Sequence, residues 1–227
     1  MVAQPVEHNQ AELAPIEEHA PVSRDQRVLL DRVSWELFEQ ILAADPDRRV
    51  PRLAYDDGAL ELMTPSSDHE HLGSTVASLI DRLAEEWRIE SFATGAVTMK
   101  SDAFRRATEP DSSFYIQHYA VMRSGVRPED PGAPPPDLVV EIELSRDVIA
   151  RLPILAALGV PEVWRVRDDS VTILALSEGH YHEVANSLAL PLLSAVRLNE
   201  LLQCEQELSR LEWLSHVREW AAEASGQ

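Results

Sequence analysis

The sequence predicts a single α/β (α+β) domain in which helices flank a mixed central sheet. The chain has 227 residues, of which 44% are hydrophobic and 26% are charged, as is usual for one soluble domain with a sizeable core. Short β-branched runs alternate with stretches of helical period, so strands and helices are interleaved along the chain. The clearest strand contains Leu138, Val139 and Val140. An apolar run of this kind is typical of a strand that is buried on both faces.

Composition and charge exclude some classes of function and disfavour another. No apolar stretch approaches the length of a membrane span, and no signal peptide is recognisable, so we expect no membrane partner. The single cysteine, Cys204, cannot form an internal disulfide, which favours a cytoplasmic location. The formal net charge of −19 opposes the approach of a polyanion. Nucleic-acid binding would therefore need a local basic face or a partner that supplies one.

The first predicted elements follow from cap and turn signals. We expect an extended segment at 26–30, and Ser34 is typical of a residue that caps the N-terminus of a helix. The segment 45–47, Asp-Pro-Asp, would end that helix. The sequence Asp-Asp-Gly at 56–58, between two apolar segments, predicts a β-hairpin.

A second helix is predicted from the spacing of Ser67 and Glu70, which is that of a capping box. An apolar stripe of helical period continues this helix to Trp87. His69 falls in its first turn, beside the hairpin strand that carries Glu61. A histidine in this position is commonly a solvated or capping side chain, so spacing alone assigns it no function.

The middle of the chain contains short extended segments and one long loop. We expect the extended segments at 89–94, 96–100 and 112–116, and a proline-rich loop at 116–136 before the buried strand at 138–143.

A helix is predicted after the buried strand, with an apolar stripe from Val148 to Leu158 and a stop at Gly159. Pro153 lies inside this stretch, so the first turn is either kinked or begins after Val148. The remaining predicted elements are three strands and one or two amphipathic helices, at 162–166, 171–176, 180–184 and 198–222.

We expect three parts in the chain: a disordered tail over 1–23, the folded domain over 24–202 and a C-terminal helix over 203–227. The C-terminal helix carries Trp213 and Trp220. Its apolar face is compatible with either a core element or the interface of a homodimer.

Carboxylates near strand ends form the candidate site. Asp111 follows a proline, Glu141 follows the buried apolar run, and Glu143 lies two residues further on. A half-buried, unpaired carboxylate is costly, and a metal ion would remove that cost. Oxygen ligands suit Mg²⁺ or Mn²⁺ rather than zinc. Acids also close strand ends without any function, and Arg151, on the following helix, could either meet this cluster or form an ordinary ion pair.

Four separated motifs closely resemble the Uma2 family of restriction-endonuclease-like proteins: LELMTPSSDHEH, EPDSSFYI, PPPDLVVEI and LPILAALGVPEVW. The resemblance spans about residues 27–202 and implies the fold of PD-(D/E)xK nucleases, a mixed sheet flanked by helices with a metal site at its edge. It implies Mg²⁺-dependent (or Mn²⁺-dependent) hydrolysis of nucleic-acid phosphodiester bonds, with DNA as the expected partner. It also implies that Asp111 and Glu141 bind the metal, and that Glu61 (a further metal ligand) and His69 lie near it.

The chain departs from the nuclease pattern at the lysine. Two residues after Glu141 the pattern has lysine where this chain has Glu143. In the family the lysine looks displaced onto the following helix, where this chain has Arg151, and Leu155 stands in place of a tyrosine. Arginine keeps the positive charge but cannot give up a proton. If the lysine acts on the attacking water, activity should fall by ~10²-fold or more.

Two further expectations follow from this departure. The only lysine, Lys100, is an auxiliary candidate because it lies on what we expect to be a neighbouring strand. The competing hypothesis is a catalytically degenerate nuclease-fold protein that acts as a protein- or nucleic-acid-binding module.

Overall fold

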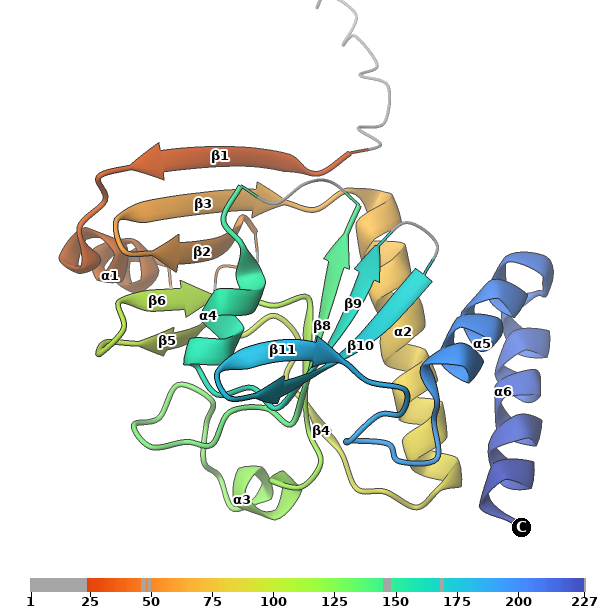
Figure 1. The fold of residues 1–227 in the computed structure, drawn as a ribbon. Helices are drawn as coiled ribbons and strands as arrows, with labels where there is room; N and C mark the ends of the chain where they lie inside the picture. The colour runs from red at the N-terminus through yellow and green to blue at the C-terminus, as the bar shows by residue number, and fades with distance from the viewer. Residues whose placement is uncertain (1–23, 46–47, 49, 145–147, 168–169, 227) are drawn as a thin grey trace, which may run out of the picture.

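The computed structural model describes residues 24–45, 48, 50–144, 148–167 and 170–226. Two β-sheets lie next to each other in this part of the chain, with helices around them (Figure 1). The α+β class and the mixed sheet flanked by helices are therefore confirmed, and a separate antiparallel sheet accompanies the mixed one. Three of the expectations lie wholly or partly outside the described residues: the tail over 1–23, residues 46 and 47 of the segment expected to end the first helix, and the last residue of the C-terminal helix.

The first sheet is antiparallel, with the strand order β1-β3-β2-β6-β5. Its strands are β1 (Gln26–Asp31), β2 (Arg52–Asp56), β3 (Ala59–Thr64), β5 (Met99–Ser101) and β6 (Arg106–Thr108). The predicted hairpin is confirmed between β2 and β3, where Gly58 has a φ of 103° that glycine adopts without strain. Helix α1 (Trp35–Ala44) covers this sheet and packs Trp35 and Phe38 against Tyr55.

The second sheet is mixed, with the order β11-β10-β9-β8-β7-β4. Its strands are β4 (Phe92–Ala93), β7 (Ser112–Tyr115), β8 (Leu138–Glu143), β9 (Glu162–Arg167), β10 (Ser170–Ser177) and β11 (His180–Glu183). Strands β8 and β9 are parallel, and helix α4 (Arg151–Ala157) connects them. The strand predicted at 138–143 is confirmed, and its first five residues are buried. Pro110 lies between β6 and β7, where the chain passes from the first sheet to the second.

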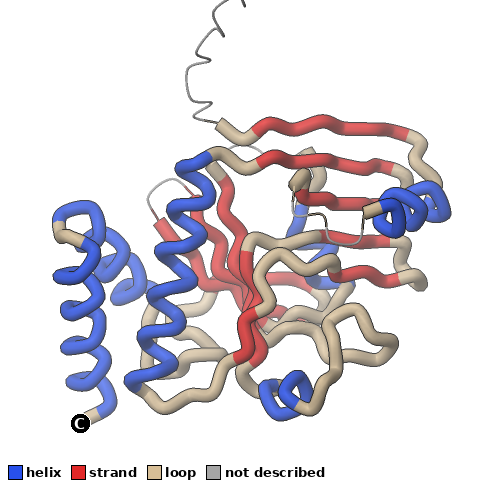
Figure 2. The backbone as a smooth tube through the Cα atoms, turned by 180° about the vertical axis from the view of Figure 1, so that it is seen from behind, coloured by secondary structure: helices blue, strands red, loops and turns tan. Residues whose placement is uncertain are grey.

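The two faces of the second sheet pack against different layers. Helix α2 (Ser67–Glu86) covers one face, together with α5 (Ala195–Glu207) and α6 (Arg210–Ser225), around a core that includes Val140 and Trp164. Figure 2 shows α2 between the strands and this C-terminal pair. On the opposite face, α4 and β5 pack Leu155 and Met99 against Val139. Because side chains alternate along a strand, Glu141 shares the α4-facing side of β8 with Val139.

The ends of several elements differ from the sequence-based expectations. Ser66 rather than Ser67 caps α2, because its Oγ accepts the His69 amide at 3.3 Å. Helix α4 begins at Arg151, which leaves Pro153 in the first turn, where its missing N–H breaks no helical hydrogen bond. Strand β6 and the short helix α3 (Tyr119–Arg123) were not expected, and both are too short to give a periodic signal.

The C-terminal helices belong to the same core as the second sheet. Helix α5 runs across residue 202, where we expected the folded domain to end. Trp213 is fully buried and its Nε1 donates to the carbonyl of Leu201 at 2.7 Å, while Trp220 packs edge-on against Trp87. Trp213 is therefore a core residue. Over the described ranges, no helix combines the length and the apolar character that a membrane crossing requires.

Candidate functional site

The predicted site residues come from five places in the chain and meet where the two sheets approach each other. Glu61 lies on β3, His69 in the first turn of α2, Asp111 just before β7, Glu141 on β8, and Arg151 at the start of α4 (Figure 1). Each of these residues lies at an end or on an inward face of its element, and the side chains are buried. The result is a network of ion pairs and hydrogen bonds, which we call the acid–arginine network.

Glu61 is completely buried and accepts four hydrogen bonds. Its Oε1 accepts from Arg27 Nη1 at 2.6 Å and from Arg151 Nη2 at 2.9 Å. Its Oε2 accepts from the backbone amides of Val148 and Ile149 at 2.8 and 2.9 Å. Burial alone would raise the pKa of Glu61, but Arg151, the Ile149 amide and Arg27 together outweigh it, and the pKa lies below its usual value. The charged form of Glu61 is therefore favoured, because four hydrogen-bond donors surround its carboxylate.

Asp111 is held on three sides. Its Oδ1 contacts His69 Nε2 at 2.8 Å and accepts from Arg52 Nη1, and its Oδ2 accepts from the backbone amide of Ile142 at 2.6 Å. The β7–β8 pairing, in which Ser112 lies opposite Val140, continues to place Asp111 beside Glu141. Asp111 and the buried strand β8 thus meet across one antiparallel ladder.

His69 is buried between two carboxylates. Its Nε2 faces Asp111, and its Nδ1 lies 3.1 Å from Asp25 Oδ2. Burial lowers the pKa of His69, but the hydrogen bond and charge of Asp111, followed by those of Asp25, outweigh it, so the pKa is raised. A histidine between two acceptors donates from both ring nitrogens when it is protonated. The expectation of a solvated side chain is wrong for His69.

The network alternates in charge from one end to the other. Arg52 continues it from Asp111 to Glu70, whose Oε1 accepts from Arg52 Nη2 at 2.7 Å. The members in order are Glu61, Arg27, Asp25, His69, Asp111, Arg52 and Glu70, with Arg151 on Glu61. With His69 protonated, four acids are matched by three arginines and one imidazolium. Glu70, at the end of the network, is 56% exposed, and the balance of the remaining charges explains how they can be buried together.

Two auxiliary candidates lie in ion pairs elsewhere. Glu143 Oε2 accepts from Arg167 Nε at 2.9 Å, and the Arg167 side chain is 58% exposed. Lys100 lies on β5, at the opposite edge of the first sheet from β1, and its Nζ donates to Glu39 at 2.6 Å. The structure therefore brings together Glu61, Asp111, Glu141, Arg151 and His69, and leaves Lys100 and Glu143 in surface pairs.

Four members of the network were missed as site residues by sequence reasoning: Asp25, Arg27, Arg52 and Glu70, of which Glu70 was noted only for its capping-box spacing. Asp25 and Arg27 are two positions apart at the start of an extended segment, so they face the same side of it. That alternation was the available signal. Arg52 carried none, because one arginine at the start of a strand is usually a surface residue.

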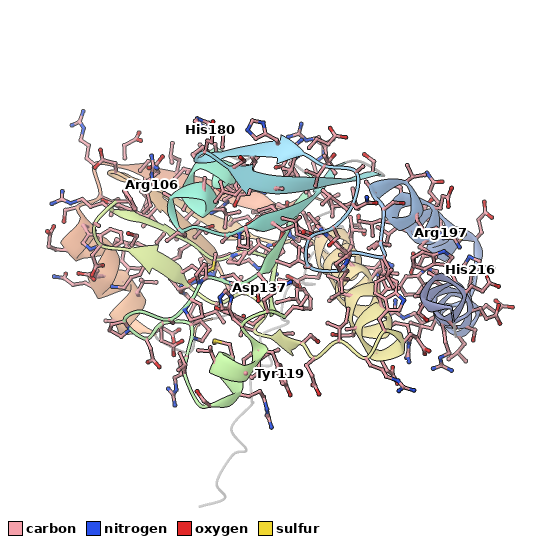
Figure 3. All side chains as sticks on the ribbon, turned by 60° about the horizontal axis from the view of Figure 1, so that its bottom comes forward. Arg106, Tyr119, Asp137, His180, Arg197 and His216 are labelled. Carbon is pink, nitrogen blue, oxygen red and sulfur yellow. The ribbon has the colours of Figure 1, made fainter. Side chains whose placement is uncertain are left out.

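Two acids of the quoted motifs have structural roles. Glu109 accepts from Arg48, Thr98 and the amide of Leu53, which fixes the chain just before Asp111. Asp137, labelled above α3 in Figure 3, is buried and accepts the amides of Ile116 and His118 at 2.7 and 3.0 Å. Both position the segments on either side of β7.

The fit of a divalent cation differs among the three predicted ligands: Glu61 has all of its about four lone-pair sites occupied, whereas the printed contacts of Asp111 occupy three and leave one on Oδ2. In the part of the chain that the structure describes, no group of three or more His, Cys, Asp and Glu side chains is arranged to hold a metal ion. Glu61 does not fit, because both of its oxygens already accept two donors and two guanidinium groups neutralise it. Asp111 and Glu141 fit by donor chemistry, since Mg²⁺ is commonly bound through one or two carboxylates plus substrate phosphates.

A comparison with known families agrees with the motifs. Residues 35–210 match the model of a family described as "Uma2: Putative restriction endonuclease". A crystal structure of a "putative nuclease belonging to DUF820" from Anabaena variabilis is similar to the chain, with 17% sequence identity and a TM-score of 0.48. That match covers 75% of this chain and 99% of the other. No curated protein matches the sequence.

Proposed function

The chain belongs to the Uma2 family, and we propose that it is an endonuclease that hydrolyses phosphodiester bonds of nucleic acid, with DNA as the substrate class. The observation that carries the proposal is the convergence of the family's site residues. Arg151 and Glu61 are 90 positions apart in the sequence, and Asp111 is 42 from His69 and 31 from Ile142, yet each pair is hydrogen-bonded. A fold that gathers these side chains where the two sheets approach each other supports a site of the PD-(D/E)xK kind.

The proposed roles follow from the chemistry of each side chain. Asp111 and Glu141 would hold Mg²⁺ or Mn²⁺, which when bound would neutralise charge on the phosphate. Arg151 contacts Glu61 and Thr108, and its fixed positive charge would suit a transition state with growing negative charge. It cannot act as a proton donor or acceptor at neutral pH. Cleavage is therefore expected to be slow compared with relatives that have lysine at this position.

A plasmid-cleavage assay tests the proposal. Supercoiled DNA is incubated at low salt with the purified chain and Mg²⁺ or Mn²⁺, and nicked and linear products are followed on a gel. We expect cleavage that is lost in Asp111→Asn and in Glu141→Gln and retained in Asp56→Asn, a surface substitution in the first sheet. A folded wild-type protein that leaves DNA intact over a broad range of metal concentrations would refute the proposal.

A second function is favoured by one observation in particular. Glu61, His69 and Arg151 are at most 5% exposed, and the acids of the network are matched by arginines. A closed and neutralised cluster is what a catalytically degenerate, binding-only member of the family would have. That alternative predicts DNA or protein binding without cleavage, and binding that Asp111→Asn leaves unchanged. Fluorescence anisotropy with labelled DNA at low salt, alongside light scattering, separates it from the enzyme.

A further inference from the structure

Two residues at the N-terminal end of the first sheet reach into the candidate site from outside the segment that matches the family model. The match begins at residue 35, whereas Asp25 and Arg27 lie just before and on β1. Their side chains are 0% and 8% exposed, although most of β1 is exposed. We propose that Asp25 and Arg27 are positioning residues of the site, and that Arg27 and Arg151 supply at Glu61 the positive charge that the family resemblance assigns to a metal ion.

The contacts of Glu61 carry the first half of this inference. A carboxylate has about four lone-pair sites, and Glu61 accepts from Arg27, Arg151 and two backbone amides. A metal ion at Glu61 would have to displace a guanidinium group from a fully buried position. Glu61 therefore links β1 and the start of α4 to β3 through ion pairs, rather than acting as a metal ligand.

The contacts of Asp25 carry the second half. Its Oδ1 accepts the backbone amide of Ser66, the N-cap of α2, at 3.0 Å, and its Oδ2 lies 3.1 Å from His69 Nδ1. The same Oδ2 accepts from Arg27 Nη2 at 3.3 Å. Asp25 thus fixes the imidazole from behind, which directs Nε2 at Asp111. Strand β1 and the residue before it therefore contribute two positioning contacts: Asp25 orients His69, and Arg27 pairs with Glu61.

A double-mutant cycle of Arg27→Gln and Glu61→Gln tests the ion pair between these two residues. Urea unfolding is measured for wild type, both single variants and the double variant, first with EDTA and then with Mg²⁺ or Mn²⁺. We expect each single substitution to lower the unfolding midpoint and the double variant to be no less stable than the worse single one. The coupling should be the same with and without metal. The half-buried pair of Arg106 and Asp56 in the same sheet, treated as Arg106→Gln and Asp56→Asn, is the matched control and should show a much smaller coupling, because solvent reaches both side chains.

Additive effects of Arg27→Gln and Glu61→Gln, or a coupling that disappears when Mg²⁺ or Mn²⁺ is added, would overturn the inference. Partial recovery of the midpoint in Arg27→Lys is expected, because the charge is kept while the two-pronged contact to Asp25 and Glu61 is lost.

Metal binding gives a second, separate readout. By calorimetry, we expect Glu61→Gln to bind Mn²⁺ with the affinity of the wild type. Loss of measurable binding in a folded Glu61→Gln variant would identify Glu61 as a ligand and refute the inference.

The role of Asp25 is tested through its partner. A cycle of Asp25→Asn with His69→Gln should be non-additive, whereas Arg24→Gln, an exposed neighbour of Asp25, should have no effect on the unfolding midpoint. Additivity of Asp25→Asn and His69→Gln would show that Asp25 does not hold the imidazole. These measurements concern the site of the proposed endonuclease but need no catalysis. A chain that fails to cleave DNA can therefore still confirm that Asp25 and Arg27 position His69 and Glu61.

Discussion

Arg151 Nη2 donates to Glu61 Oε1 at 2.9 Å, and the two side chains, 5% and 0% exposed, join the first turn of α4 to strand β3 of the first sheet. Arg151 occupies the position at which the family resemblance implies a lysine. The pair therefore has two consequences, one for stability and one for catalysis, and these can be measured separately.

For stability, we expect Arg151→Gln to lower the free energy of unfolding by about 3 kcal/mol, the scale for breaking a buried ion pair on one side. The reason is that Glu61 stays buried with one of its two cations removed. Urea unfolding at pH 7 measures the loss. A variant as stable as the wild type would show that Arg27 and the backbone amides compensate Glu61 without Arg151.

For catalysis, we expect Arg151→Lys to raise plasmid cleavage by ~10²-fold, because a lysine can exchange a proton and an arginine cannot. The comparison with Arg151→Gln, in which the charge is absent, separates the effect of the proton from that of the charge. Cleavage that is equal in the wild type and in Arg151→Lys would mean that the side chain acts only through its charge.

A different buried acid, Glu162, should be purely structural. It is fully buried at the start of β9 and accepts from Trp164 Nε1, Ser187 Oγ and the amide of Ala189 at 2.6, 2.7 and 3.0 Å. In Glu162→Gln the new amide N–H₂ would face donors, so we expect a loss of about 2 kcal/mol in the free energy of unfolding. Glu183→Gln on the exposed strand β11 is the control and should change little.

Two glycines should respond to alanine with opposite signs. Gly159, after α4, has a φ of 78°, so Gly159→Ala should destabilise the fold by about 1 kcal/mol. Gly73 lies inside α2, where an added Cβ would meet no neighbouring atom within 4 Å, so Gly73→Ala should stabilise the fold by about 0.5–1 kcal/mol. Thermal unfolding of both variants checks the signs. A stabilising Gly159→Ala would show that the turn tolerates a side chain.

Divalent cations should bind through Asp111 and Glu141. We expect calorimetric binding of Mn²⁺ that is lost in Glu141→Gln and retained in Glu143→Gln, because Glu143 is paired with Arg167 at the surface. Equal binding by the Glu141→Gln variant would place the cation elsewhere in the chain.

The sequence by itself determined the local elements that have strong periodic or turn signals. Strand β8, the β2–β3 hairpin and the cap at Ser34 were predicted from a branched apolar run, an Asp-Asp-Gly turn and a serine before a helical stripe. The motifs also identified the family. Each of these features depends on residues that are close in the chain, which is why a single sequence can show them.

Only the tertiary structure decided how the strands divide into two sheets and how the buried charges pair. Strand pairing depends on contacts between distant segments, and β6, with three residues, gives no pattern of its own. The partners of Glu61 lie 34 positions before it and 87 to 90 positions after it, and no local rule assigns them. The cation that pairs with a buried carboxylate is decided by the tertiary structure, and for Glu61 these cations are the arginines Arg27 and Arg151.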